Sequence, residues 1–278
     1  MNNLTLRTIT GIAFVLVIVA SLMLKPLLFG AVFLTVMLFS LDEFYNISMG
    51  DEYPAQRRLA LLTSTVFFIT VYSHVRYGIS ISWLCLSFLL LLTIGISFIF
   101  LTREERVNLE KLPLVYTGLA YIALPIGLSP FLVYRCGYFD GKLLLAFFVL
   151  IWISDIGAYC LGSIFGQKEN SRKLAPSISP KKSWVGFWSG ILFSIIASVV
   201  LYYTGLLPFK LVQCVSLAII ISVSGVCGDL FESVWKRHYG VKDSGNCIPG
   251  HGGMLDRFDS SFFAVPVACI YLTLTGQF

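Results

Sequence analysis

The sequence predicts an all-α, polytopic integral membrane protein with about nine transmembrane helices. The chain is 57% hydrophobic and 13% charged, whereas a soluble domain is about one quarter charged. Apolar runs of about 20 residues recur from end to end, and this is the length that an α-helix needs to cross a bilayer. The runs are continuous rather than alternating with period two, which argues against a membrane β-barrel.

Nine apolar segments are candidate membrane spans. Only Lys25 and Pro26 separate the first two, but a single merged helix would be far too long for a hydrocarbon core about 30 Å thick. No small-x-small cleavage site follows the first run, so we interpret it as a membrane helix rather than a signal sequence. The segments are residues 8–24, 26–47, 59–75, 79–101, 112–134, 143–165, 184–204, 211–235 and 258–276.

The basic residues are distributed unevenly between the connections. With a cytoplasmic N-terminus, the N-terminal end and the even-numbered connections hold 15 of the 20 lysines and arginines. An excess of lysine and arginine marks cytoplasmic loops. The sequence therefore predicts a cytoplasmic N-terminus and an external C-terminus.

Asp155 is the first residue that departs from the apolar composition, because it lies well inside the predicted helix 143–165. A carboxylate at that depth is costly and should face the bundle interior, a cavity or a partner. Asp155 could form the wall of a polar site or contact a substrate. It could equally make a packing hydrogen bond, since Gly157, Ala158 and Gly162 have the small-residue spacing of packed helices. The residues leave both interpretations open.

The connection 168–184 carries five basic residues. Its composition alone favours binding to anionic lipid headgroups. Alternatively, Ser179, Lys181 and Lys182 could reach into a polyphosphate site, since lysine binds phosphate as a point charge.

Charge is concentrated again at the end of the eighth candidate span. In a helix, Asp229, Ser233 and Lys236 fall at i, i+4 and i+7 and therefore share one face. The helix should end at Gly240, a suitable C-terminal cap. A glycine-rich loop follows, and a new helix would place Asp256 three residues before Asp259, with both carboxylates on one side.

Carboxylates from two helices, surrounded by lysine and arginine, suit a complex of Mg²⁺ with a polyphosphate. Mg²⁺ takes one or two carboxylates together with phosphate oxygens and water, and basic side chains neutralise phosphate charge. The competing interpretation is a set of structural ion pairs at the membrane surface. It explains Lys242 and Asp243, but neither an intramembrane Asp229 nor so many glycines.

The assembled residues resemble the signature of the phosphatidate cytidylyltransferases, also called CDP-diacylglycerol synthases. In outline that signature is S-x-x-K-R, four residues, K-D, and then H-G-G-x-x-D-R-x-D. Two positions depart from the family: Trp235 replaces an aliphatic residue or Phe, and Val185 replaces a frequent acidic residue. The resemblance covers roughly residues 150–260. The residues that carry it, with all spacings met, are Ser233, Lys236-Arg237, Lys242-Asp243, His251-Gly252-Gly253, Asp256-Arg257 and Asp259, with Asp155-x-x-Ala158-Tyr159, Ser179-Pro180-Lys181-Lys182 and Gly228-Asp229-Leu230 before them.

The resemblance implies transfer of the cytidylyl group of CTP to phosphatidate, which releases pyrophosphate and forms CDP-diacylglycerol for phospholipid biosynthesis. It implies that Asp229 and Asp256 bind a metal with help from Asp259, and that Ser233, Lys236 and Arg257 complete the catalytic set. It also implies dependence on Mg²⁺ and leaves room for a monovalent cation such as K⁺. The substrate-binding residues that it implies are Asp155, Ser179, Lys181, Lys182, Arg237, Lys242, Asp243 and His251.

The remaining expectations concern organisation. Residues 1–140 are predicted to form a helical scaffold and residues 141–278 a catalytic core with cytoplasmic loops, within one integral membrane unit. The resemblance implies a homodimer in the inner membrane, with CTP, phosphatidate and the bilayer as partners and no nucleic acid. The site should face the cytoplasm, with Asp155, Asp229 and Asp256 lining one connected cavity.

Two alternatives stay open. The nearer is another use of CTP, by a CTP-dependent polyprenol kinase or by a cytidylyltransferase for a different lipid phosphate. The second is an ion transporter with an anion site. Intramembrane carboxylates would suit a transporter, but the nine segments show no obvious inverted repeat.

Overall fold

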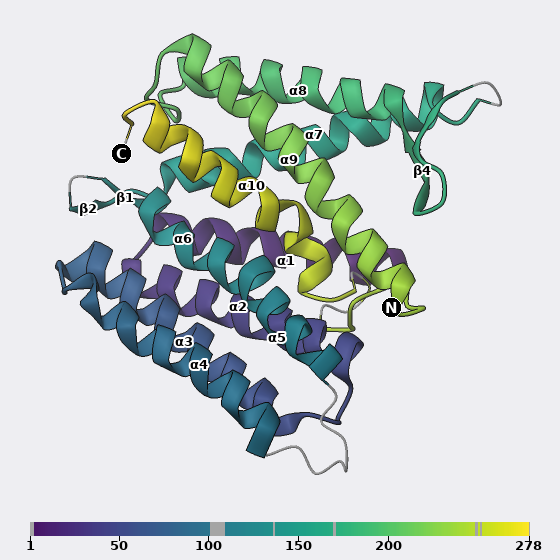
Figure 1. The fold of residues 1–278 in the computed structure, drawn as a ribbon. Coiled ribbons are helices and arrows are strands. Elements are labelled where there is room, and N and C mark those ends of the chain that lie inside the picture. Colours follow the sequence, from purple (N-terminus) through teal and green to yellow (C-terminus); the bar gives the residue numbers. More distant parts are fainter. Residues whose placement is uncertain are drawn as a thin grey trace. The chain divides into compact units, whose positions relative to one another are not determined.

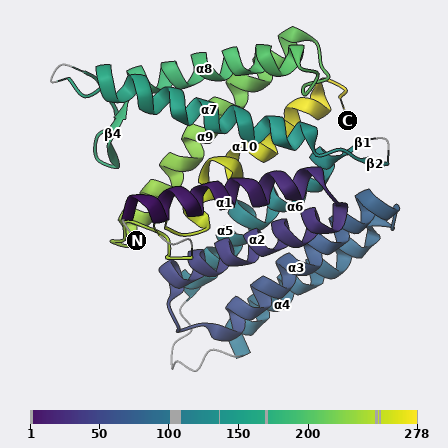
Figure 2. The ribbon, with the colours of Figure 1, turned by 180° about the vertical axis from the view of Figure 1, so that it is seen from behind.

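The chain is almost entirely helical in the computed structural model, which describes residues 3–100, 109–135, 137–168, 171–247, 250 and 252–277 (Figures 1 and 2). The longer helices are α1 (Asn3–Met23), α2 (Pro26–Met49), α3 (Pro54–Tyr77), α4 (Leu84–Phe100), α7 (Lys142–Phe165), α8 (Trp184–Tyr203), α9 (Leu211–His238) and α10 (Leu255–Leu274). The shorter elements are η1 (Ile81–Trp83), η2 (Leu109–Lys111), α5 (Leu112–Gly118), η3 (Leu119–Ala123), α6 (Leu124–Val133), β1 (Tyr134–Arg135), β2 (Tyr138–Phe139), β3 (Lys173–Ala175) and β4 (Ser179–Ser183).

Eight helices within the described residues are long and apolar enough to cross a membrane. They coincide with the second to ninth predicted spans, and the first predicted span falls on α1, whose apolar part Thr8–Met23 is shorter. The prediction of an all-α polytopic membrane protein is therefore confirmed. The direction in which the termini face stays a prediction.

The chain divides into two compact units. The first comprises Met1–Phe139 and Asp243–Arg257, and the second comprises Asp140–Lys242 and Phe258–Phe278. Helix α10 begins in the first unit and continues in the second. The predicted division at residue 140 separates a scaffold from a catalytic core, and that functional division stays a prediction.

In the first unit, helix α2 packs against α1, α3 and α5. Pro26 and Pro54 stand at the starts of α2 and α3, where a missing N–H costs nothing. Arg57 of α3 ties the end of α2 in place, since it donates to the Gly50 carbonyl (2.7 Å) and to Asp42 (2.8 Å). The span Leu112–Val133 is interrupted by a π-helical turn, η3, immediately before Pro125.

In the second unit, α7 and α8 lie side by side and α9 packs against both (Figures 1 and 2). Glycines let α7 and α8 approach closely: a Cβ on Gly162 would lie 3.2 Å from the Cα of Gly186. Serine hydroxyls join the layers, with Ser154 of α7 lying 2.6 Å from Ser222 of α9. This is the small-residue and hydroxyl packing typical of membrane helices, and it is one of the two interpretations that the spacing around Asp155 left open.

The connection 168–184 contains the hairpin of β3 and β4. Lys173 is paired with Ser183, and Ala175 with Ser179, in antiparallel register. The Ser183 hydroxyl then accepts a hydrogen bond from the Gly186 amide (3.2 Å) and caps α8, as serine does at many helix N-termini.

Candidate functional site

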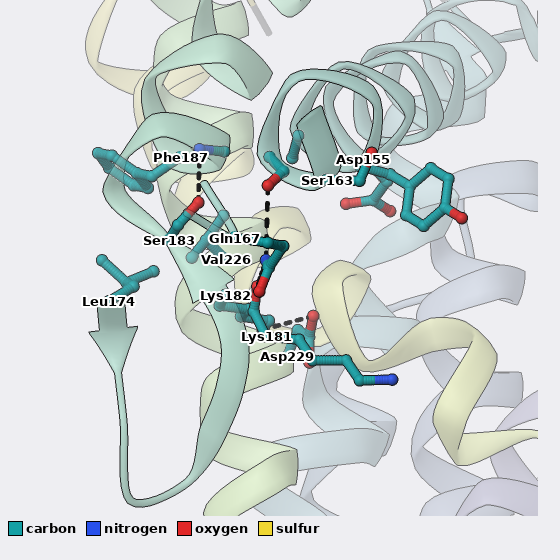
Figure 3. A pocket seen from close by; sticks show the side chains of 14 residues that line it. Asp155, Ser163, Gln167, Leu174, Lys181, Lys182, Ser183, Phe187, Val226 and Asp229 are labelled. Carbon is teal, nitrogen blue, oxygen red and sulfur yellow. Dashed lines mark hydrogen bonds and ion pairs between the residues drawn. The ribbon is translucent and has the colours of Figure 1, made fainter. Parts of the chain in front are cut away.

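A cavity of about 480 Å³ opens in the second unit between the hairpin and helices α7 and α9 (Figure 3). Helix α7 contributes Asp155 and Tyr159, the hairpin contributes Lys181 and Lys182, and α9 contributes Asp229. Apolar side chains and glycines make up much of the remaining wall. The structure thus brings together four residues that sequence reasoning had selected from three separate segments: Asp155, Lys181, Lys182 and Asp229.

The shortest polar contact in the cavity joins Lys182 of the hairpin to Asp229 of α9. The Lys182 ammonium lies 2.5 Å from Asp229 Oδ2, and the two side chains are 24% and 36% exposed. Figure 3 shows the lysine side chain directed at the carboxylate. Lysine at this position therefore has a specific anionic partner inside the cavity, in addition to any role at a lipid surface.

The hairpin that carries Lys181 and Lys182 is fastened to the end of α7. The Gln167 amide donates to the Lys181 carbonyl (2.7 Å). Lys173 donates to the Gly166 carbonyl (2.8 Å) and to the Gln167 side chain (2.7 Å). Sequence reasoning grouped Lys173 with the loop's basic residues and did not select Gln167, because nothing local shows which strand a glutamine will reach.

Helix α9 presents the polar face that its spacing predicts. Ser233 donates to Asp229 Oδ1 at 3.4 Å, one turn away. Lys236 pairs with Glu232 at 2.7 Å, and Glu232 is 1% exposed. Glu232 therefore belongs with this polar cluster as the counter-ion of Lys236.

The helix ends where its glycine predicts. Gly240 has φ +71°, and the Val241 amide donates to the Lys236 carbonyl at 2.9 Å, which is the Schellman pattern of a left-handed cap. Arg237 donates to the Val241 carbonyl at 3.2 Å. Partial burial raises the pKa of the neighbouring Tyr239 phenol, and Lys242 is exposed.

Asp259 of α10 lies near Asp229, because glycine lets the two helices approach. A Cβ on Gly228 would meet the Asp259 carbonyl group, at 3.2 Å from its carbon. The Asp259 carboxylate lies within electrostatic range of Asp229, Asp155 and Lys182. Asp259 thus interacts electrostatically with two carboxylates and a lysine that line the cavity.

Asp256 and Arg257 belong to the first unit, together with the glycine loop. Asp256 Oδ2 accepts hydrogen bonds from the Gly253 amide (2.8 Å), the Ser244 amide (2.9 Å) and the Ser244 hydroxyl (2.9 Å). Arg257 and Asp243 are exposed. A cavity shared by Asp155, Asp229 and Asp256 stays a prediction. His251 lies outside the described residues.

Sequence reasoning missed Ser244 of this loop and its contact Glu43 of helix α2. Ser244 is buried and contacts both Asp256 and Glu43 of α2. Glu43 did carry a signal, since it is a carboxylate inside the predicted span 26–47, as Asp155 is inside another. Its partners lie about two hundred positions later in the chain, so only the fold could identify them.

The donor set fits Mg²⁺ in kind. Within the described residues no three His, Cys, Asp or Glu side chains form a cluster able to hold a metal alone. Mg²⁺ needs only one or two carboxylates when phosphate oxygens and water complete its octahedron. Asp229, partly exposed in the cavity and with Asp259 nearby, supplies ligands of that type.

Comparison with known proteins gives a family match over nearly the whole chain. Residues 5–275 match the model of the Cytidylyltransferase family, so the similarity extends well beyond the motif region 150–260. The phosphatidate cytidylyltransferase of Bacillus subtilis (strain 168) is 44% identical over 126 residues, which cover 45% of each chain. That of Staphylococcus aureus (strain COL) is 33% identical over 216 residues, or 78% of this chain and 68% of the relative. The match therefore spans about half the length of the B. subtilis relative.

Proposed function

The chain belongs to the cytidylyltransferase family, and on that premise we propose that it transfers the cytidylyl group of CTP to phosphatidate, giving CDP-diacylglycerol and pyrophosphate. The names of the similar bacterial proteins support the choice of substrates. The observation that carries the proposal is the Lys182–Asp229 ion pair in the cavity lined by α7, α9 and the hairpin. A reaction between two phosphate groups needs both a cation-binding carboxylate and a phosphate-binding cation at one place.

The reaction joins two anions. An oxygen of the phosphatidate phosphate attacks the α-phosphorus of CTP, and the bond from that phosphorus to the oxygen bridging toward the β-phosphorus breaks. Pyrophosphate leaves with the electron pair. Because the nucleophile is already anionic, no Ser-His-Asp arrangement is needed, and the obstacle is repulsion between the reactants.

Basic side chains address that repulsion. Lys181 and Lys182 line the cavity and are positioned by the Gln167 contact, so they can hold phosphate oxygens and lower the cost of their approach. Lys236, held by buried Glu232, and Arg237 follow on α9. Lys242 and Arg257 are exposed, and we propose that they bind the β- and γ-phosphates of the nucleotide.

Asp229, Asp256 and Asp259 would hold Mg²⁺, with room for a monovalent cation such as K⁺. A bound Mg²⁺ would neutralise phosphate charge and orient the leaving pyrophosphate. Ser233, 3.4 Å from Asp229 Oδ1, steadies that carboxylate. Asp229 is paired with Lys182 here, so Lys182 would exchange part of this contact for substrate phosphate when both reactants bind.

The site must reach a soluble nucleotide and a lipid at once. We place it at the cytoplasmic face of the inner membrane, in accord with the excess of basic residues in the connections on that side. A homodimer is part of the same proposal, and crosslinking in native membranes tests it.

The test uses the purified chain with CTP and phosphatidate. CTP labelled at the α-phosphorus should pass its label to the lipid, whereas CTP labelled at the γ-phosphorus should not. Lipid labelled from the γ position would instead identify a CTP-dependent lipid kinase. Ion flux in proteoliposomes without CTP consumption would identify a transporter.

A further inference from the structure

Glu43 lies in the last two turns of helix α2, yet its carboxylate is bound by residues about two hundred positions later, Ser244, Met254 and Leu255. Oε1 accepts a hydrogen bond from the Met254 amide (2.9 Å). Oε2 accepts one from the Leu255 amide (2.8 Å) and lies 3.1 Å from the Ser244 hydroxyl. The side chain is 8% exposed. These contacts all lie within the first compact unit.

The donors explain why a carboxylate is tolerated in this helix. Met254 and Leu255 stand at the start of α10, where backbone amides lack partners within the helix. Glu43 accepts from both and so caps α10 from another helix. No lysine or arginine of the described residues forms an ion pair with Glu43, so backbone amides and a hydroxyl stabilise its carboxylate.

The loop glycines make room for this carboxylate. A Cβ on Gly245 would lie 2.7 Å from Glu43 Oε1, and a Cβ on Gly253 would overlap Glu43 Oε2 and the Ser244 hydroxyl. Real Cβ atoms do not approach so closely. Two of the glycines that make this loop distinctive therefore face Glu43, a residue about two hundred positions earlier.

Ser244 connects Glu43 to Asp256. Its hydroxyl lies 3.1 Å from Glu43 Oε2 and 2.9 Å from Asp256 Oδ2, and its amide donates to the same Asp256 oxygen at 2.9 Å. The Gly253 amide adds a third donor at 2.8 Å. The orientation of Asp256 thus depends on a loop whose two ends are fixed by Glu43.

We propose that Glu43 is a positioning residue, which holds Ser244, Met254 and Leu255 against α2 and thereby sets the orientation of the Asp256 carboxylate. For its effect on catalysis the proposal rests on the proposed function of Asp256. In this proposal Glu43 acts only through hydrogen bonds to other protein groups and does not contact the substrate. Residues that hydrogen-bond to a metal ligand orient it, and loss of such a residue costs about 10–100-fold in activity or metal affinity. We expect Glu43 to orient Asp256 in the same way, through Ser244 and the loop backbone.

The test compares Glu43→Gln with Asp42→Asn, which removes one charge from the adjacent residue of the same helix. Gln keeps one oxygen acceptor but places an NH₂ group against the Met254 or Leu255 amide. Asn at position 42 keeps an acceptor for Arg57, which now lies 2.8 Å from Asp42. Glu43→Gln should lower kcat, or raise the Mg²⁺ concentration for half-activity, by about 10–100-fold. The KM for CTP should change little, and Asp42→Asn should stay within about twofold.

A second measurement does not depend on turnover. Cys247 is exposed in the same loop, and partial burial, with the nearby Glu43 carboxylate, raises the pKa of its thiol. In a chain whose other six cysteines are replaced by alanine, Glu43→Gln should shift the pH profile of Cys247 alkylation to lower pH. Asp42→Asn should leave the profile unchanged.

The outcomes separate the two proposals. An active wild type whose Glu43→Gln variant keeps full activity and Mg²⁺ dependence, or whose Cys247 profile does not move, overturns the role of Glu43. Equal losses in Glu43→Gln and Asp42→Asn overturn it as well. A wild type that makes no CDP-diacylglycerol refutes the proposed function, while the Cys247 profile still shows whether the Glu43 carboxylate lies beside the loop.

Discussion

Replacing Asp229 with asparagine tests whether this residue is a metal ligand or one half of a structural ion pair. Lys182→Met is its matched partner, because either change breaks the same 2.5 Å contact. Only Asp229→Asn removes a carboxylate from the proposed metal site. The comparison therefore separates a loss of the ion pair from a loss of the ligand.

The exposure of the two side chains sets how much stability either variant should lose when the ion pair is broken. Exposed ion pairs contribute about 0.2–1 kcal/mol, whereas breaking a fully buried pair costs about 3–5 kcal/mol. With side chains 24% and 36% exposed, the Lys182–Asp229 pair lies between them, and each single variant should lose roughly 1–2 kcal/mol of stability. That corresponds to a fall of a few degrees in melting temperature, about 2–4 °C per kcal/mol for a chain of this size class.

The effects on catalysis should differ sharply. Loss of one phosphate-binding lysine should lower kcat/KM by about 10²-fold, as for a single preorganised donor. Loss of a metal ligand should lower it by about 10³-fold or more, equivalent to roughly 4 kcal/mol of transition-state stabilisation. Formation of labelled CDP-diacylglycerol across a Mg²⁺ titration measures both, and excess Mg²⁺ should partly restore only Asp229→Asn.

The double variant, with both Asp229→Asn and Lys182→Met, completes a double-mutant cycle. If the pair is only structural, the two single variants should lose the same activity and the double variant should be no worse than either. That result, or turnover by Asp229→Asn within about threefold of wild type, would refute the metal role assigned to Asp229. Melting temperatures of all three variants show whether folding explains any loss.

Three further predictions follow from the loop and from the metal. Gly252→Ala should lower the melting temperature more than Gly240→Ala, since both have positive φ but only a Cβ at 252 would meet Asp256 Oδ2, at 2.7 Å; equal shifts would contradict this. Gly253→Ala should crowd Glu43 and lower kcat with little change in the KM for CTP, measured by steady-state kinetics. Chelation of divalent metal by EDTA should stop turnover and added Mg²⁺ should restore it, whereas an EDTA-insensitive enzyme would exclude the proposed mechanism.

Local chemistry explains which parts of the site the sequence could predict. The end of α9 follows from Gly240, whose left-handed conformation stops a helix. The shared face of Asp229, Ser233 and Lys236 follows from 3.6 residues per turn, and the contact of Ser233 with Asp229 confirms it. Each prediction needed only residues within two helical turns.

Partners far apart in the chain were beyond such reasoning. The loop composition predicted that Lys182 binds either anionic lipid headgroups or a phosphate. It could not show that this lysine pairs with Asp229, 47 positions later. Glu232 lies one turn before Lys236, but its near-complete burial as the partner of that lysine depends on how α9 packs. Tertiary packing decides these pairings, and the periodicity of the sequence does not reveal which helices or strands will pack together.

The glycine loop shows how a correct motif can receive an incomplete physical explanation. A glycine-rich loop beside a polyphosphate site suggests that the backbone approaches the phosphates, since the amides of such loops can form an anion-binding nest. Within the described part of the loop, the Gly253 amide donates to Asp256, and the Met254 and Leu255 amides donate to Glu43. These donors are already used by protein carboxylates. We therefore expect lysine and arginine side chains, rather than these three amides, to hold a phosphate near this part of the loop, where Gly245 and Gly253 make room for Glu43.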